Sequence, residues 1–296
     1  MGSKVYLDSN VWLDLVEGSP TDIFPNLQAL VDLGRIDVVA SELNLIEILA
    51  GGNRPEASAV LRRLFAVTSS WLYLSGLATR EVVFAFDNPR RARSLLPVAK
   101  LYAWSEILPL ITTDSDREQV SELAEPTMEA LRTAFPADDI REHQEHWKHE
   151  LSSQNTALRD ELKYIGTVQN FFRKTVASAL RVNLGDSREL ADRLWDDPDL
   201  APAFRLEIEL GAHVLNVPTP RWRHNDLLDH AHAGVLGYVD YFITRDGAGK
   251  KRGLIQKLHW YDQTVRVPRA RLPYGHKLCA SWSDLEQRIV KDTDPC

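Results

Sequence analysis

The sequence is poor in cysteine and has no long apolar stretch. Its 296 residues include two cysteines, Cys279 and Cys296, and neither belongs to a CxxC motif or a Cys/His cluster. This argues against a disulfide framework and a structural zinc site, and it favours a reducing compartment. No apolar run approaches the roughly 20 residues that span a bilayer. The first residues lead into an expected strand rather than a signal peptide, so we expect a cytoplasmic protein with no membrane partner.

The sequence also lacks an overall excess of positive charge. Its formal net charge of −7 disfavours a protein whose whole surface binds nucleic acid. Basic residues gather near the end, where positions 221–296 hold thirteen Lys and Arg against nine Asp and Glu, whereas positions 1–79 and 80–220 are both net acidic. A local basic surplus suits contact with phosphate groups. The alternative for any one of these lysines is a solvated loop, with about equal weight.

The first 79 residues alternate between strand and helix patterns. A hydrophobic content of 44% with 26% charged residues allows a sizeable core in one large or two ordinary domains. Apolar patterns and caps predict strands at about 4–8, 37–40 and 71–74, with helices from Asn10, from about 22 to 34, and from Ser41. Such alternation is typical of an α/β fold with a parallel sheet covered on both faces.

The alternation stops over positions 80–214, which we interpret as a large all-α insertion or subdomain. The longest amphipathic pattern runs from Ile140 to Leu180, with apolar residues at steps of three, four and seven. Shorter helical patterns lie at about 91–108, 116–134, 187–196 and 200–212. The α/β pattern then resumes in 215–296, with a helix through Gly237, strands at 241–244 and near 264–267, and a closing helix from Ser281 or Ser283 to Val290. Positions 1–79 and 215–296 are therefore expected to form one domain.

Four acidic residues stand where an α/β fold places its chemistry. Asp8 ends the first expected strand, Glu47 lies on the helix after the second, and Asp226 and Asp246 lie in the C-terminal α/β segment. Strand ends and the helix starts after them project side chains into the crevice at the carboxyl edge of a parallel sheet. Converging carboxylates need a cation, and Mg²⁺ or Mn²⁺ suits their oxygens. Asp229 shares a helical face with Asp226 and is kept as an auxiliary or alternative third acid.

The pattern resembles the PIN-domain family of metal-dependent nucleases. The resemblance is carried by Leu7-Asp8-Ser9-Asn10, by Ser41-Glu42-Leu43 through Glu47, and by Asp226 through Thr244-Arg245-Asp246. It implies a PIN-like parallel β-sheet flanked by helices, with an acid in each of four places and a Thr or Ser before the last. It also implies hydrolysis of phosphodiester bonds, in RNA rather than DNA, to leave 5′-phosphate and 3′-hydroxyl ends. A typical PIN domain has no counterpart of the helical insertion.

Residues near the four acids are expected to support them. We expect Thr244 and Asn10 to hold the carboxylates in register, although Asn10 has an equally good interpretation as the cap of the first helix. The basic residues after the last strand are expected to neutralise substrate phosphate, and they are Arg245, Lys250, Lys251 and Arg252.

Two other functions are compatible with parts of the sequence. In the first, a catalytically inactive PIN fold serves as an interaction module, with the helical insertion contacting a protein partner, an antitoxin or a second copy of the chain. Clustered acids weigh against it, because a scaffold has no physical need for them. The second is a phosphatase of the haloacid-dehalogenase kind, which expects an Asp two positions after its nucleophile. Asn10 occupies that position here.

Overall fold

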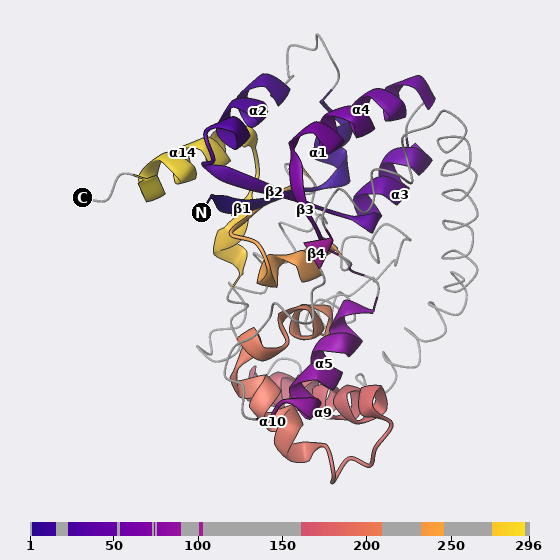
Figure 1. The fold of residues 1–296 in the computed structure, drawn as a ribbon. Coiled ribbons are helices and arrows are strands. Elements are labelled where there is room, and N and C mark those ends of the chain that lie inside the picture. Colours follow the sequence, from indigo (N-terminus) through magenta and orange to yellow (C-terminus); the bar gives the residue numbers. More distant parts are fainter. Residues whose placement is uncertain are drawn as a thin grey trace.

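The central element of the molecule is a mostly parallel β-sheet with helices packed on it (Figure 1). The computed structural model describes residues 2–15, 23–51, 54–72, 74, 76–89, 101–102, 161–208, 232–245 and 274–293. Six strands lie in the order β4-β3-β2-β1-β5-β6. They are β1 (Ser3–Leu7), β2 (Ile36–Ser41), β3 (Thr68–Leu72), β4 (Leu101–Tyr102), β5 (Tyr241–Ile243) and β6 (Leu278–Cys279). All pairs are parallel except β3 with β4.

The strand order places β1 at the point where the chain changes direction across the sheet. From β1 the chain adds β2 and β3 on one side, and β5 and β6 pair on the other side. At such a switch point the connections leave a crevice outside the carboxyl ends of the strands. Residues that directly follow β1 and β5, namely Asp8 and Thr244, therefore lie next to each other at this edge.

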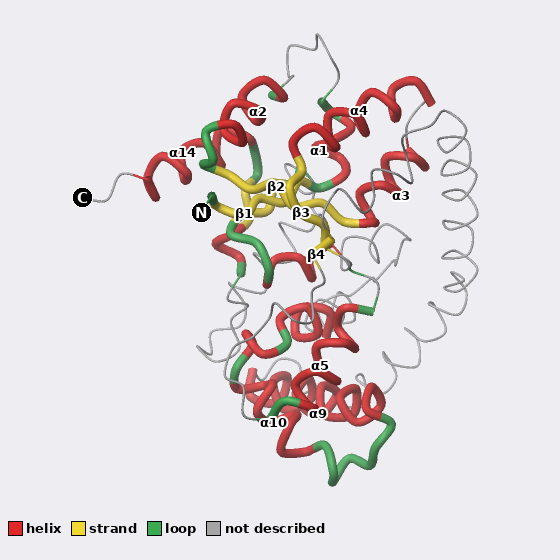
Figure 2. The backbone as a smooth tube through the Cα atoms, in the orientation of Figure 1, coloured by secondary structure: helices red, strands yellow, loops and turns green. Residues whose placement is uncertain are grey.

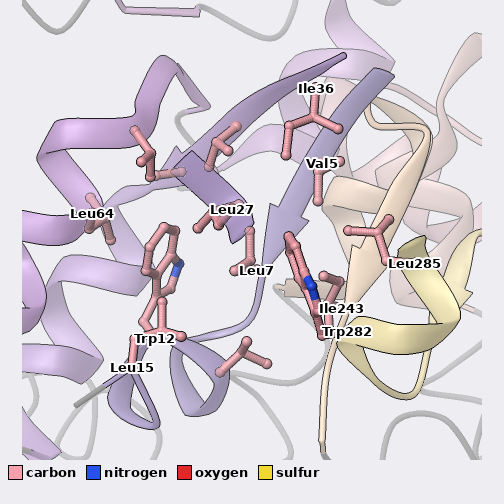
Figure 3. Packing of buried hydrophobic residues seen from close by; sticks show 14 of the residues in the cluster. Val5, Leu7, Trp12, Leu15, Leu27, Ile36, Leu64, Ile243, Trp282 and Leu285 are labelled. Atoms are coloured by element: carbon pink, nitrogen blue, oxygen red, sulfur yellow. The ribbon is translucent and has the colours of Figure 1, made fainter. Parts of the chain in front are cut away.

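Alternating side chains of the strands face two separate cores. Val5 and Leu7 are fully buried on one face of β1, whereas Tyr6 is fully buried on the other. A strand buried on both faces reads as a continuous apolar run, which explains the strand pattern in the sequence. The Val5 face packs against Trp12 and Leu64 of the neighbouring helices (Figure 3).

Helices cover the two faces of the sheet from different parts of the sequence. The Val5 face is packed by α1 (Ser9–Leu13), α2 (Phe24–Asp32), α3 (Glu42–Gly51), α4 (Arg54–Val67) and α14 (Trp282–Thr293). The Tyr6 face is packed by Leu77 at the start of α5 (Leu77–Asp87) and by Ala203 and Leu206 of the helical residues 202–208. The 80–214 segment thus helps to cover the sheet, because its apolar side chains fill the second face.

A third core joins helices of the 80–214 segment. In it α5 and residues 202–208 pack against α9 (Glu161–Leu180) and α10 (Arg188–Asp196) (Figure 2). The Phe172 ring contacts the rings of both Trp195 and Phe204. The expected helix at 187–196 is confirmed, as is the end of the long pattern at Leu180. Short 3₁₀ turns complete the described elements at Pro198–Leu200 (η2), Gly234–Gly237 (η3) and Gly275–Lys277 (η4).

Several sequence expectations need correction. The segment 80–214 is not all helical, because β4 lies within it, in the stretch expected as a helix at 91–108, and extends the sheet beyond β3. The third strand begins at Thr68 and ends at Leu72 rather than spanning 71–74, because backbone pairing with β2 includes polar residues that an apolar pattern misses. The two-residue β6 was not expected. The strand expected near 264–267 lies outside the described residues. Among the described helices, none is both long and apolar enough to cross a membrane.

Candidate metal centre

Asp8 is held in one orientation at the switch point of the sheet. It is the N-cap of α1, and its Oδ1 accepts a hydrogen bond from the Ser9 amide at 2.7 Å. Its Oδ2 accepts from Asn10 Nδ2 at 2.9 Å and from the Thr244 hydroxyl at 2.6 Å. The residue is 8% exposed. Donors from α1 and from the end of β5 therefore fix a buried carboxylate between the two strands.

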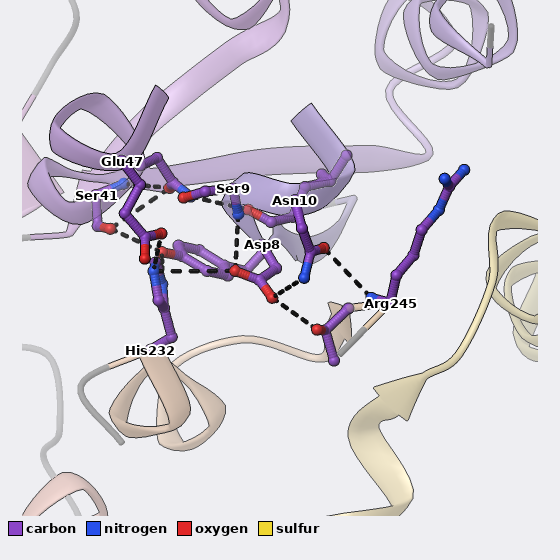
Figure 4. A network of polar contacts seen from close by, with 11 residues as sticks. Asp8, Ser9, Asn10, Ser41, Glu47, His232 and Arg245 are labelled. Atoms are coloured by element: carbon purple, nitrogen blue, oxygen red, sulfur yellow. Dashed lines mark hydrogen bonds and ion pairs between the residues drawn. The ribbon is translucent and has the colours of Figure 1, made fainter. Parts of the chain in front are cut away.

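Glu47 and His232 meet Asp8 from two other elements. Glu47 lies on α3, and His232 lies in the short helical stretch directly before η3. The His232 Nε2 atom is 2.7 Å from Glu47 Oε2 and 3.9 Å from Asp8 Oδ1. Figure 4 shows the three side chains pointing toward one another. One ligand atom from each lies within 4.8 Å of the others.

The two carboxyl groups have opposite pKa shifts. Burial raises the pKa of Asp8 above its ordinary value, and the charge of His232 and the Thr244 hydrogen bond offset only part of this. Burial also acts to raise the pKa of Glu47, but the hydrogen bond and charge of His232, with a hydrogen bond from Ser9, lower it below its ordinary value. Cationic charge at this point therefore stabilises both carboxylates, because each is buried beside the other.

The donor set fits a divalent cation. Two carboxylate oxygens and an imidazole nitrogen are ligand types that first-row divalent metals use, and carboxylate oxygens also suit Mg²⁺. Among the described residues, Asp8, Glu47 and His232 are the group of His, Cys, Asp and Glu side chains close enough together to share an ion. Hydrogen bonds outside the cluster orient two of the three side chains. Tyr6 contacts His232 Nδ1, and Asn10 and Thr244 donate to Asp8.

The structure brings together half of the four predicted acids. Asp8 and Glu47 meet as expected from their positions after β1 and on α3. Of the two roles expected for Asn10, the hydrogen bond to Asp8 is observed, and the helix cap is Asp8 itself. Thr244 contacts Asp8, as expected. The other predicted residues lie outside the described part of the chain, and they are Asp226, Asp229, Asp246, Lys250, Lys251 and Arg252.

Arg245 is described, and its side chain is engaged elsewhere. Its backbone amide donates to Asn10 Oδ1 at 3.3 Å, whereas its guanidinium forms an ion pair with Asp14. In Figure 4 the guanidinium is directed away from Asp8. The expected contact of Arg245 with substrate phosphate would thus have to compete with Asp14.

His232 is the member of the cluster that the sequence analysis missed. The available signal was its position three residues after Asp229 on an expected helix, which repeats the helical spacing that made Asp229 a candidate. A histidine on an apolar helix carries no indication of its partners, because its ring nitrogens pair with residues that are close only in the folded chain.

Comparisons with known proteins add no support to the resemblance to PIN-domain nucleases, which is carried by the residues of this chain alone. Neither a protein-family model, nor a curated protein, nor a solved structure matches it. What the structure establishes is an α/β fold with a parallel sheet and a buried Asp/Glu/His cluster at the carboxyl edge of its central strand.

Proposed function

We propose that the chain is a Mg²⁺- or Mn²⁺-dependent nuclease that hydrolyses phosphodiester bonds, in RNA rather than DNA, to leave 5′-phosphate and 3′-hydroxyl ends. The observation that supports it best is the convergence of Asp8 and Glu47 with His232 at the switch point of the sheet. Open α/β sheets bind their ligands at this location. The polymer and the end chemistry rest on the resemblance to PIN-domain nucleases.

Asp8 and Glu47 would hold the cation together with His232, and Asp226, Asp229 and Asp246 are the further acids proposed for this role. A bound divalent ion would acidify a water molecule and withdraw charge from the scissile phosphate. Asp246 follows Thr244 by two positions, and Thr244 itself contacts Asp8. This nearness in the sequence supports Asp246 as a further ligand.

The surrounding residues keep the carboxylates ready to bind. Thr244, Asn10 and the Ser9 amide all donate to Asp8, and a carboxylate that accepts several hydrogen bonds has its oxygens fixed in direction. A carboxyl group must be deprotonated to bind a metal. Because the pKa of Asp8 is raised, metal binding is predicted to release a proton from Asp8 when the pH is near or below that pKa. Substrate phosphate is proposed to contact Arg245, Lys250, Lys251 and Arg252.

The test compares the native chain with Asp8→Asn on end-labelled single-stranded RNA and DNA, in Mg²⁺, in Mn²⁺ and in EDTA. We expect cutting only with metal, faster on RNA, and a loss of about 100-fold or more in Asp8→Asn because a direct ligand charge is removed. Asn retains an oxygen for the Ser9 amide, so the cap of α1 is preserved. Asp32→Asn is the matched control, since Asp32 is an exposed acid on α2 that pairs with Gln28.

Two results would contradict the proposal in different ways. Faster cutting of DNA than RNA would overturn the substrate assignment and leave the nuclease in place. If the native chain cuts neither polymer and calorimetry detects no Mn²⁺ binding, the catalytic function is wrong, and the helical segment becomes the place to seek a protein partner.

A further inference from the structure

His232 stands between the two carboxylates and a chain of buried polar side chains. One ring nitrogen, Nε2, faces Glu47 and Asp8. The other, Nδ1, is 2.6 Å from the Tyr6 hydroxyl, which is 2.7 Å from the Ser41 hydroxyl. Tyr6, Ser41 and His232 are all at most 2% exposed. Water therefore has little part in deciding which of these groups donates and which accepts.

The direction of the chain is set at its far end by a backbone carbonyl. Asn44 Nδ2 lies 3.1 Å from the Leu7 carbonyl oxygen, which can only accept, and 3.2 Å from Ser9 Oγ. The amide nitrogen of Asn44 must therefore face Leu7, and its Oδ1 faces Ser41. That oxygen accepts from the Ser41 backbone amide at 3.0 Å and from the Ser41 hydroxyl at 3.4 Å.

Each hydroxyl has a single proton, so the direction is passed along the chain. When Ser41 donates its proton to Asn44, its oxygen accepts from the Tyr6 hydroxyl. Tyr6 has then used its own proton, and its oxygen accepts from His232 Nδ1. A neutral imidazole that carries its proton on Nδ1 has its lone pair on Nε2.

In this neutral tautomer, the lone pair on Nε2 faces an atom that also only accepts. Glu47 Oε2 lies 2.7 Å from it, and the oxygens of an ionised carboxylate have no proton to give. Two acceptors at this separation need a positive charge between or beside them, and Asp8 Oδ1 adds a third acceptor 3.9 Å away. In the metal-free protein, a proton on Nε2 can supply this positive charge. A divalent cation satisfies all three atoms together.

We propose that His232 Nε2 is a direct ligand of the cation held by Asp8 and Glu47, and that it makes the site prefer first-row transition metals over Mg²⁺. This rests on the metal-dependent function proposed above. Imidazole nitrogen suits transition metals, whereas Mg²⁺ takes oxygen ligands and gives up its water reluctantly. Tyr6 is then a positioning residue, because it fixes the tautomer and the ring orientation of the ligand.

The direct test is pulsed electron paramagnetic resonance on the native protein loaded with Mn²⁺, which detects coupling to a coordinated imidazole nitrogen. Among the first-row divalent metals, Mn²⁺ binds a given site most weakly, so a nitrogen coupling with Mn²⁺ is a demanding test of coordination by His232. We expect a nitrogen coupling in the native protein, and none in His232→Asp. In calorimetry, His232→Asp should narrow the ratio of Mn²⁺ to Mg²⁺ affinity by about tenfold or more, since an oxygen replaces nitrogen. The control is His276→Asn, which changes an exposed histidine on η4 and should alter neither result.

Tyr6→Phe tests the positioning role separately. We expect the nitrogen coupling to persist, because the ligand is still present, while Mn²⁺ affinity falls about 10–100-fold with the loss of the outer hydrogen bond. Thermal unfolding of the metal-free variants measures the structural effect of each change. A Tyr6→Phe protein that melts lower but binds Mn²⁺ as tightly as the native chain would overturn the positioning role.

The outcomes also separate this inference from the nuclease proposal. If the native protein binds Mn²⁺ without nitrogen coupling and His232→Asp retains its Mn²⁺ preference, the inference is wrong, while the nuclease proposal stands on the carboxylates. If nitrogen coupling is present but no polymer is cut, the inference stands and the nuclease proposal fails. If the native protein binds neither cation, both are wrong.

Discussion

Two regions of the molecule bury carboxylates, and they differ in what surrounds the acid. At the edge of the sheet, Asp8 and Glu47 face one another with an imidazole beside them. On α5, Glu81 is fully buried and accepts from the backbone amides of Ala203 at 3.1 Å and Phe204 at 2.8 Å, and from the Tyr238 hydroxyl. Glu81 thus caps the helical residues 202–208 and joins them to the chain that enters β5.

The difference shows that burial of an acid does not by itself indicate a functional site. Burial raises the pKa of Glu81 to about 8, and its three hydrogen bonds oppose this shift only in part. Its oxygens are nevertheless satisfied by donors that the fold supplies, two of them backbone amides. Asp8 and Glu47 instead place two carboxylates around one imidazole nitrogen. We infer a structural role for Glu81 and a ligand-binding role for the pair at the sheet edge.

The largest expected effects come from substituting one buried acid in each region and comparing the effects on stability and on Mn²⁺ affinity. Glu81→Ala should lower the free energy of unfolding by about 3 kcal/mol or more, because three buried donors lose their acceptor. Mn²⁺ affinity of the folded variant should stay unchanged. Glu47→Gln should weaken Mn²⁺ binding at least about tenfold, yet change the unfolding free energy of the metal-free protein by no more than about 1.5 kcal/mol, since the amide oxygen still accepts from His232.

Urea unfolding in EDTA and calorimetry with Mn²⁺ measure the two quantities. Glu81→Gln, which keeps the side-chain volume and one acceptor oxygen, serves as the milder variant if Glu81→Ala does not fold. A loss of Mn²⁺ affinity in folded Glu81→Gln as large as in Glu47→Gln would remove the distinction between the two regions.

A second expected effect is a pH dependence of stability that belongs to Glu81. Its pKa in the folded chain is about 8, above the ordinary value of 4.5, so between these values the folded chain binds more protons than the unfolded chain. The stability from this group is complete below about pH 4.5 and is lost as pH rises through about 8. Glu81→Gln should flatten that part of the profile, measured by urea unfolding from pH 5 to 9 in EDTA. If the unfolding free energies of the native chain and Glu81→Gln differ by the same amount at every pH, this assignment to Glu81 is wrong.

The smallest expected effect concerns Arg245, which lies beside the candidate metal centre but is paired with Asp14. The two side chains are 46% and 38% exposed, and exposed ion pairs contribute little, so Arg245→Ala should change the unfolding free energy by less than about 1 kcal/mol. Loss of its proposed phosphate contact in this variant should reduce the salt-dependence slope of RNA binding by about one. Asp14→Asn is the companion variant, because it frees the guanidinium and should tighten RNA binding. An unchanged slope in Arg245→Ala would limit the residue to its pair with Asp14.

Local patterns predicted the parts of the fold that depend on local physics. The strands around Tyr6 and Val39 and the helix α10 follow from apolar runs and helical periodicity, which reflect how neighbouring residues share burial. The short strands β4 and β6 have two residues each, too few for any period, and they form because neighbouring strands offer free backbone groups.

The same distinction applies to the candidate site. The sequence by itself determined that Asp8 ends a strand and that Glu47 lies on the helix after the next strand, because strand and helix formation are decided by nearby residues. Only the tertiary structure decided that His232 joins them. It lies 185 positions from Glu47 and 226 from Tyr6, and it meets both because β5 pairs directly with β1. The orientation of its lone pair depends on hydrogen bonds that exist only once those strands are adjacent.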